Sequence, residues 1–220
     1  MIRRRYYSTE TRLFITNTKE RATMIKILTL GAAGVLGSEI TWQLESLPDV
    51  EQVCCDVRGL PYRRKNGTNV KANALEKSQL VPLVKGQDFI ICSLNGDWLG
   101  MAKALVAAIP EGQDTQIIWV TGLGIHNEVR GIYGLFWRHY AAAYPDYIEA
   151  ADYIASSGFP YTLIRTADLT ENGDSSYHLQ KEGQGVNSRF VSRAAVAKLI
   201  TRIVTEPTLI YRNESIGITN

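Results

Sequence analysis

The chain has few cysteines and no long apolar run. Its 220 residues include only three cysteines, Cys54, Cys55 and Cys92, and all three fall in segments that we predict to be buried strands. Neighbours along a strand point to opposite faces of a sheet, so Cys54 and Cys55 favour neither a disulfide nor a metal site. No apolar run approaches the roughly 20 residues of a membrane helix. We therefore expect no metal, no membrane association and a reducing cytoplasmic location.

The chain also lacks a strong excess of either charge. Its 24 basic and 22 acidic side chains give a net charge of +2. Residues 1–23 hold six basic and two acidic groups (+4), which leaves 18 basic and 20 acidic groups (−2) on the remainder. A mildly acidic body argues against a nucleic acid as the main partner.

The organisation predicted from the sequence is a basic N-terminal extension over residues 1–23 and one domain over residues 24–220. Met24 directly precedes an apolar run of the kind with which such domains begin. A flexible extension is the favoured interpretation of the first segment. An organellar presequence and a nucleic-acid arm are the alternatives, and the glutamates Glu10 and Glu20 count against the presequence.

Apolar strand patterns alternate with helical patterns along residues 24–220. Strands are predicted at 25–30, 50–57, 68–72, 88–94, 116–120, 161–165 and 214–219. Helices are predicted from Val35, over 76–84, from Trp98 to Ile109, over 147–156 and after an N-cap at Ser192. This alternation is typical of a parallel sheet with right-handed crossovers. The predicted fold is α/β, a single Rossmann-type doubly wound parallel sheet with helices on both faces.

Residues 25–37, IKILTLGAAGVLG, predict a buried strand, a tight glycine turn and the start of a helix. This order is the one in which proteins bind a dinucleotide pyrophosphate. Gly31 would permit the turn, Gly34 the approach of the backbone to phosphates, and Gly37 close packing of the helix on the strand. The predicted contacts of this loop are Gly31, Ala32, Ala33, Gly34, Val35, Leu36 and Gly37.

Small or polar residues follow four further predicted strands. In doubly wound sheets the ligand lies beyond the carboxyl ends of the strands. These ends therefore predict a cofactor groove lined by Asp56, Arg58, Asn73, Ala74, Ser93, Leu94, Asn95, Thr121 and Gly122.

The second strand end carries conflicting signals about the cofactor. Asp56 lies 19 residues after Gly37, where an acid can accept a hydrogen bond from a ribose 2′-hydroxyl, which favours NAD. Arg58 could instead neutralise a 2′-phosphate, which favours NADP. Asp56 has two further roles open to it, bonding to the glycine turn or pairing with Arg58. Residues 63–65 (Arg-Arg-Lys) are interpreted as a solvated basic loop that could add to this pocket.

Several segments together resemble a known family. GAAGVLG, IICSLNG, IIWVTGLGI, YIEAADYIASSGFPYTLIRTADLT and RFVSRAAVAKLI are similar to the atypical short-chain dehydrogenase/reductases. Within them, the NmrA-like NAD(P)H-binding proteins, also described as epimerase/dehydratase-like or biliverdin-reductase-B-like, are most similar. Many of these relatives prefer NADP and place an arginine where this chain has Arg58. The resemblance therefore favours NADP(H), with NAD(H) as the alternative.

The chain departs from the family pattern at three strand ends. Ala72-Asn73 stands where relatives carry Gly-Asp, and the Asn73 amide could still bond to the adenine edge. Thr121-Gly122 stands where relatives have Ser-Ser, and the Thr121 hydroxyl could replace the serine near the nicotinamide. Thr166 stands where relatives often have proline, in a segment that the resemblance places beside the nicotinamide.

The proton-relay pair of the wider superfamily, Tyr-x-x-x-Lys, is absent from the expected region. Tyr147 is followed at +4 by Ala151, and Glu149 stands where some relatives have a lysine. The one literal match, Tyr177 to Lys181, lies beyond the sixth predicted strand and is interpreted as chance. Reduction of flavin-, biliverdin- or quinone-type acceptors can use a proton from solvent, so this absence does not exclude chemistry.

The favoured function is hydride transfer from NAD(P)H to a small carbonyl, quinone or flavin-type acceptor. Thr121 and Tyr147 are the candidate catalytic residues, and His126, Arg165 and Thr166 are candidate substrate contacts. Trp137, Tyr140 and Tyr144 could line the substrate pocket. The alternative is a non-catalytic NAD(P)-binding redox sensor that acts on a regulatory protein partner. A third hypothesis gives the basic N-terminus a nucleic-acid or membrane-surface role.

Overall fold

The computed structural model describes residues 24–126, 128–129, 131–171, 173–186, 188–206 and 208–220. The predicted extension over residues 1–23 lies outside this part. The strands are β1 (Ile25–Leu30), β2 (Val50–Asp56), β3 (Gly67–Lys71), β4 (Phe89–Cys92), β5 (Gln116–Gly122), β6 (Tyr161–Thr166), β7 (Asp168–Thr170), β8 (His178–Lys181), β9 (Phe190–Ser192) and β10 (Glu214–Thr219). The helices are α1 (Val35–Glu45), α2 (Lys77–Val84), α3 (Trp98–Ala108), α4 (Gly131–Ala143), α5 (Pro145–Ala155) and α6 (Arg193–Thr205).

Eight strands form one sheet in the order β3-β2-β1-β4-β5-β6-β10-β8. All neighbours run parallel except β8, which is antiparallel to β10. The chain first proceeds outward from β1 to β3 and then returns to the other side of β1, so the strand order reverses between β1 and β4. This reversal is the switch point at which doubly wound sheets bind ligands. The predicted fold is confirmed.

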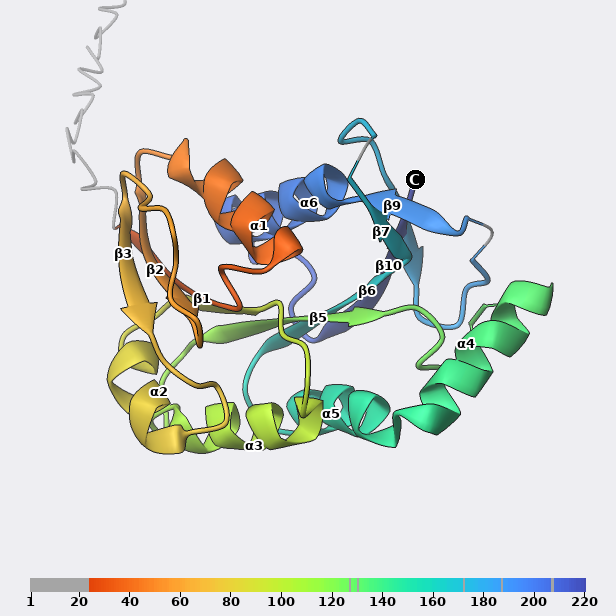
Figure 1. Cartoon of the computed structure of the whole chain (residues 1–220), viewed down its shortest axis with the longest axis horizontal. Coiled ribbons are helices and arrows are strands. Elements are labelled where there is room, and N and C mark those ends of the chain that lie inside the picture. The colour runs from red at the N-terminus through yellow and green to blue at the C-terminus, as the bar shows by residue number, and fades with distance from the viewer. Residues whose placement is uncertain (1–23, 127, 130, 172, 187, 207) are drawn as a thin grey trace, which may run out of the picture.

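Helices cover both faces of this sheet (Figure 1). Helices α1 and α6 pack on one face, and α2, α3 and α5 pack on the other. Successive residues of β1 therefore enter different cores, since Ile27 packs with the α1 and α6 side and Leu28 with the α3 and α5 side. Strands buried on both faces are apolar almost throughout, which explains why β1, β4 and β5 were predictable from apolar runs alone.

The ends of the predicted elements differ from the observed ones by a few residues, and four elements were missed. Ser192 is the N-cap of α6, because the backbone N–H of Ala195 donates to its Oγ at 3.0 Å. Helix α4 was not predicted, because it leaves Ile132, Leu135 and Phe136 exposed and has no single buried apolar face. Strands β7, β8 and β9 have only three or four residues each, too few for a pattern.

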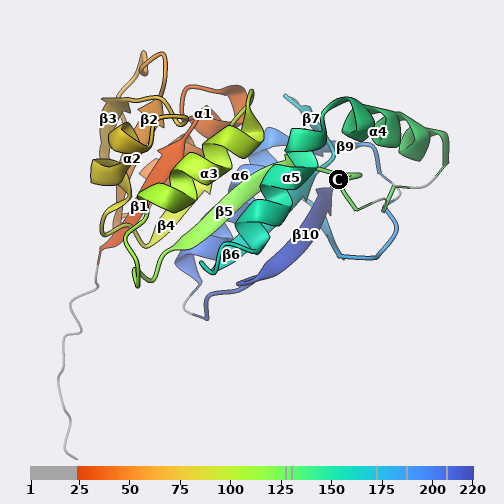
Figure 2. The ribbon, with the colours of Figure 1, turned by 90° about the horizontal axis from the view of Figure 1, so that it is seen from below.

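Helix α4 extends from α5 beyond the end of the sheet, and the short strands β7 and β9 lie near it (Figure 2). Strands β7 and β9 pair parallel to form a second, two-stranded sheet. None of the helices in the described ranges combines the length and apolar character needed to cross a membrane. Within the same ranges, no three acidic, histidine or cysteine side chains are grouped as metal ligands would be.

Candidate functional site

The glycine turn links the end of β1 to the start of α1. Gly31 adopts φ of +83°, and a Cβ at this position would overlap the carbonyl oxygen of Ser93. A Cβ at Gly37 would overlap the carbonyl oxygen of Gly31, so α1 could not lie this close to the strand end. These two roles predicted from the sequence are confirmed. At Gly34 a Cβ would meet only the Gly31 oxygen at 3.1 Å, and this residue faces the groove described below.

Asp56, at the end of β2, is attached to the glycine turn. Its carboxylate is 7% exposed and accepts a hydrogen bond from the backbone N–H of Ala33 at 3.2 Å. The other carboxylate oxygen accepts from the Arg58 backbone N–H at 3.0 Å and lies 3.4 Å from Arg58 Nε. Asp56 therefore adopts both of the alternative roles considered for it, bonding to the turn and pairing with Arg58. The Arg58 side chain remains 72% exposed.

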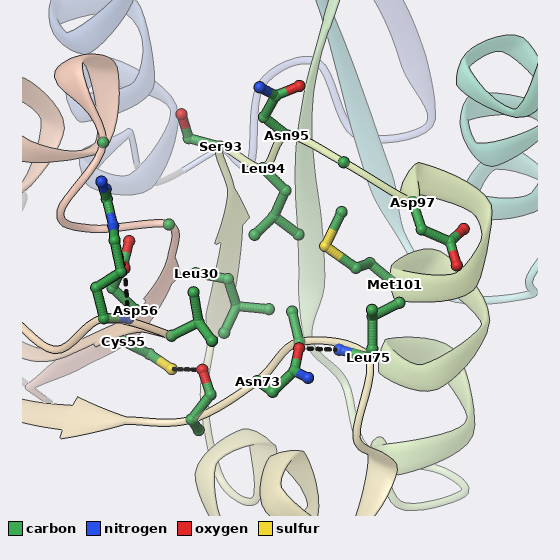
Figure 3. Close-up of a pocket in the computed structure, with 17 residues that line it drawn as sticks. Leu30, Cys55, Asp56, Asn73, Leu75, Ser93, Leu94, Asn95, Asp97 and Met101 are labelled. Carbon is green, nitrogen blue, oxygen red and sulfur yellow. Dashed lines mark hydrogen bonds and ion pairs between the residues drawn. The ribbon is translucent and has the colours of Figure 1, made fainter. Parts of the chain in front are cut away.

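A groove of about 420 Å³ lies beyond the ends of β1 to β4, next to the switch point (Figure 3). Leu30, Leu94 and Met101 point toward its middle and give it an apolar floor, while Asp56 and Asn73 supply polar atoms at the sides. An apolar slot with a few polar groups at its rim fits the flat adenosine half of a dinucleotide. The lining residues are Leu30, Gly31, Gly34, Cys55–Arg58, Ala72–Leu75, Ser93–Asp97 and Met101.

The side-chain amide of Asn73 has its oxygen hydrogen-bonded and its nitrogen available to a ligand. Its Oδ1 accepts from the backbone N–H of Leu75 at 3.1 Å, which fixes the orientation of the side chain. Its Nδ2 donates no hydrogen bond to a described residue, and the side chain lines the groove. A primary amide donor at this place can bond to a ring nitrogen of adenine.

A second cavity of about 460 Å³ continues the groove toward the ends of β5 and β6. Both cavities include Gly34, Arg58, Ser93, Leu94 and Asn95 in their linings, so they form one extended groove across the strand ends. The additional residues of the second cavity are Val35, Leu36, Trp98, Val120, Thr121, Tyr140, Tyr147, Thr166 and Leu169. One half of the groove suits adenosine and the other suits nicotinamide together with a reactant.

The polar atoms of the second cavity come from Thr121, Tyr147 and Thr166. The Thr121 hydroxyl is buried and has no hydrogen bond of regular geometry to any described residue. Burial raises the pKa of Tyr147 to about 12, whereas the neighbouring Thr121 hydroxyl and Gly122 backbone favour the phenolate and offset part of this rise. A Cβ at Gly122 would lie 2.6 Å from Tyr147 Oη, so glycine is what allows the tyrosine to reach the strand end. Tyr147 is therefore a neutral hydrogen-bond donor at physiological pH.

Comparison with known proteins identifies the family. A family model described as NAD(P)H-binding matches residues 31–207, which is most of the chain and includes the glycine turn. The chain belongs to this NAD(P)H-binding family. The NAD(P)H-binding character that the resemblance implied is thereby confirmed. A search of curated proteins finds no match.

Several solved structures share the fold of this family member. A Rossmann-fold NAD(P)-binding family protein from Shigella flexneri is 28% identical, with a TM-score of 0.75 over 90% of this chain and 94% of the other. A short-chain dehydrogenase/reductase from Veillonella parvula in complex with NADP is 21% identical, with a TM-score of 0.74 over 89% and 94%. An anaerobilin reductase from Escherichia coli O157:H7 is 17% identical, with a TM-score of 0.66 over 88% and 96%. The Veillonella and Escherichia structures are less than 25% identical to this chain, so they show a shared fold only.

Most of the residues predicted to contact the cofactor come together in the groove. Those that line it are Gly31, Gly34, Val35, Leu36, Asp56, Arg58, Asn73, Ala74, Ser93, Leu94, Asn95 and Thr121. Ala32, Ala33, Gly37 and Gly122 lie beside it and shape its backbone. Arg64 does not point into the groove. Its guanidinium bonds to the Ser38 carbonyl at 2.8 Å and stacks on Tyr62 at 4.2 Å.

Two of the three predicted substrate contacts lie elsewhere. Arg165 is fully buried, pairs with Glu128 and donates from Nε to Ser215 Oγ at 2.9 Å, so a substrate cannot reach it. His126 does not line the groove, and its ring nitrogens lie 2.9 Å from Glu182 and 3.8 Å from Asp152. Thr166 does line the second cavity, where its hydroxyl donates to the Thr121 carbonyl at 3.2 Å.

Sequence reasoning missed several lining residues, including Leu75, Met101, Trp98 and Leu169. Met101 and Trp98 are one turn apart at the start of α3, directly after the end of β4, and this position was the available signal. Leu169 lies on β7, a strand of three residues that is too short to show a sequence pattern. The Tyr177 to Lys181 match falls on and beside the edge strand β8, where residues four apart are separated by about 13 Å.

Proposed function

We propose that this protein is an NADPH-dependent reductase of a small conjugated or carbonyl acceptor, of the quinone or flavin type. The observation that carries the proposal is the second cavity, because the buried Thr121 hydroxyl and the neighbouring neutral Tyr147 hydroxyl lie at the end of the groove opposite the adenosine half. Bound NADPH would supply a hydride there, and the acceptor would gain this hydride and one proton. Both ends of the groove fit a nicotinamide dinucleotide.

The residues of the second cavity would mainly orient the acceptor. The Tyr147 hydroxyl would donate a hydrogen bond to the acceptor oxygen or nitrogen on which negative charge develops. No lysine lies one helical turn away to lower the tyrosine pKa, since Ala151 occupies that position and is fully buried. Tyr147 would therefore retain its proton, and the acceptor would take its proton from solvent. The Trp98 and Tyr140 rings would cover the flat face of a conjugated acceptor.

NADPH is preferred in this proposal because of the Asp56–Arg58 arrangement. The Asp56 carboxylate already accepts from two backbone N–H groups and pairs with Arg58, which leaves it little capacity for a ribose hydroxyl. The exposed Arg58 guanidinium lies at the rim of the groove, where it can form a charge-assisted pair with a 2′-phosphate.

The proposal is tested by mixing the protein and NADPH with a panel of quinones, flavins and aldehydes and following absorbance at the nicotinamide band. We expect oxidation well above background with at least one conjugated acceptor. Tyr147→Phe should lower kcat/KM about 10-fold or more and leave the Kd for NADPH within about twofold, because the lost hydrogen bond acts on the acceptor. Background oxidation with every acceptor would contradict the proposal.

A second candidate is a non-catalytic NADP(H) sensor that acts on a regulatory protein. The buried Ala151 and the raised Tyr147 pKa favour it, since no group at the second cavity is poised to transfer a proton. A sensor must discriminate between the two redox forms of its ligand. Equal Kd values for NADP⁺ and NADPH in a calorimetric titration would exclude this candidate.

A further inference from the structure

A third cavity, of about 520 Å³, lies beside α4 and is lined by Val129, Ile132, Tyr133, Phe136, Val186, Ser188 and Arg189. Apart from Ser188 and Arg189 its lining is aliphatic or aromatic. Its walls include exposed apolar surface, because Ile132 is 88% exposed and Phe136 is 56% exposed. Exposed apolar surface of this kind, with one cation at its side, fits an apolar chain that ends in an anion.

Arg189 lies at this cavity with its side chain 61% exposed and contacts three neighbouring side chains. Its guanidinium lies 5.1 Å from the centre of the Tyr133 ring and 5.4 Å from that of Phe190. Its Nε lies 3.3 Å from an Asp168 carboxylate oxygen. Neither terminal nitrogen donates a hydrogen bond to a described residue, so both can bind a carboxylate in the bidentate manner that guanidinium groups favour.

An aromatic path connects this cavity to the acceptor end of the groove. Tyr133, Trp137 and Tyr140 lie on one face of α4, with ring centres 6.1 Å and 5.5 Å apart along the series. Tyr133 lines the third cavity and Tyr140 lines the second. On the opposite side, Asp168 pairs with Arg189 while its neighbour Leu169 lines the second cavity.

We propose that the third cavity is the outer part of the acceptor site and that Arg189 selects acceptors carrying a carboxylate. The inference rests on the proposed reductase function and adds to it a substrate class, an extended molecule with a reducible ring and an acidic apolar arm. The ring lies against Tyr140, Tyr147 and Thr121, and the arm follows the face of α4 to Arg189.

The test compares two acceptors that differ only in charge, a naphthoquinone with a carboxyalkyl chain and its methyl ester. We expect kcat/KM for the acid to exceed that for the ester about 5- to 10-fold in the wild type, a moderate value because the Arg189 side chain is exposed to solvent. Arg189→Met should reduce this ratio to about one, and Arg189→Lys should keep part of it. A structural role of Arg189 would instead lower both kcat/KM values and leave their ratio intact.

Two further variants sharpen the result. Asp168→Asn removes the anion beside the guanidinium and should raise the acid-to-ester ratio severalfold. Arg212→Met serves as the matched control, because Arg212 pairs with Asp114 at the opposite end of the strands, and the ratio should not change. A wild-type ratio near one, or one unaffected by Arg189→Met, would overturn the inference.

A binding experiment separates failure of the inference from failure of the proposed function. Quenching of tryptophan fluorescence, with NADP⁺ present, gives the Kd of the acid and of the ester even if neither is reduced. Preference for the acid that Arg189→Met abolishes would support the third cavity as a carboxylate site although the reductase proposal had failed. Equal binding of acid and ester would reject the carboxylate site, whichever way the turnover experiment came out.

Discussion

The Asp56 carboxylate accepts a hydrogen bond from the backbone N–H of Ala33 at 3.2 Å, which joins the end of β2 to the glycine turn after β1. Asp56 is therefore part of the scaffold of the groove. We expect Asp56→Ala to lower the free energy of unfolding by about 1–2 kcal/mol, because it leaves backbone N–H groups without their acceptor. The Kd values for NADH and NADPH should rise by similar factors, measured by calorimetric titration. A loss confined to NADH would show that Asp56 acts on the ribose directly.

Arg58 is expected to determine the preference for NADPH. Arg58→Met removes the exposed guanidinium at the rim of the groove and should raise the Kd for NADPH about 10-fold, because one charge-assisted pair with the 2′-phosphate is lost. The Kd for NADH should change by less than about twofold. Arg63→Met is the matched control, since Arg63 is exposed in the following loop and does not line the groove. Equal losses for both cofactors would contradict the assignment.

Gly31→Ala tests the glycine turn. It combines a positive φ with overlap between the new Cβ and the Ser93 carbonyl, so we expect a loss of about 3 kcal/mol or more in chemical denaturation and loss of NADPH binding. Gly112→Ala is the control, because Gly112 has φ of +77° but no atom within 4 Å of an added Cβ. It should lose only about 1 kcal/mol, the cost of the backbone conformation. Equal losses in the two variants would show that the contact with Ser93 has no effect.

The raised pKa of Tyr147 predicts a loss of stability at alkaline pH. Its pKa is about 12 in the folded protein, above the value of about 10 expected in the unfolded chain, so the folded state retains the proton over this interval. The stability that comes from the protonated Tyr147 is complete below about pH 10. It falls by up to about 2 kcal/mol as the pH rises to 12. The difference in unfolding free energy between wild type and Tyr147→Phe should therefore decrease across this range. A constant difference would show that Tyr147 titrates normally.

The buried ion pair of Arg165 and Glu128 is expected to be structural. Burial alone would raise the pKa of the Glu128 carboxyl, but backbone N–H groups and Arg165 together hold it below its usual value. Glu128→Gln leaves Arg165 buried without a counter-charge and should cost about 3 kcal/mol in chemical denaturation. Asp114→Asn, which breaks the exposed pair with Arg212, should cost less than about 1 kcal/mol. If Glu128→Gln lowered the free energy of unfolding as little as Asp114→Asn, water would have to reach the ion pair of Arg165 and Glu128.

Sequence-based prediction succeeded for residues that are packed against neighbours on several sides. Strands β1, β4 and β5 are buried on both faces, so their apolar runs predicted them, and the Gly31 and Gly37 contacts follow from the spacing of the turn. Arg165 was misassigned because a charged residue at a strand end usually faces solvent or a ligand. Its partner, Glu128, lies 37 residues earlier in an irregular segment, and no local pattern links the two.

Helix α4 is an element that could not be predicted from the sequence. Tyr133 and Trp137 are partly buried against the core while Ile132, Leu135 and Phe136 are exposed, so apolar residues surround the helix and the usual periodicity is lost. The third cavity depends on this helix and on Val186, Ser188 and Arg189, more than 40 positions away. Only the folded arrangement brings them together.

The strand order has a consequence for the degradation of the protein in the cell. Because the groove lies at the ends of β1 to β6, a dinucleotide that spans it would touch six strands at once and would bind only the folded chain. At a free concentration about 100 times its Kd, such a ligand adds about 2.7 kcal/mol to the folding equilibrium. The resistance of the chain to proteolysis would then vary with the supply of nicotinamide dinucleotide, so its abundance would report on that supply.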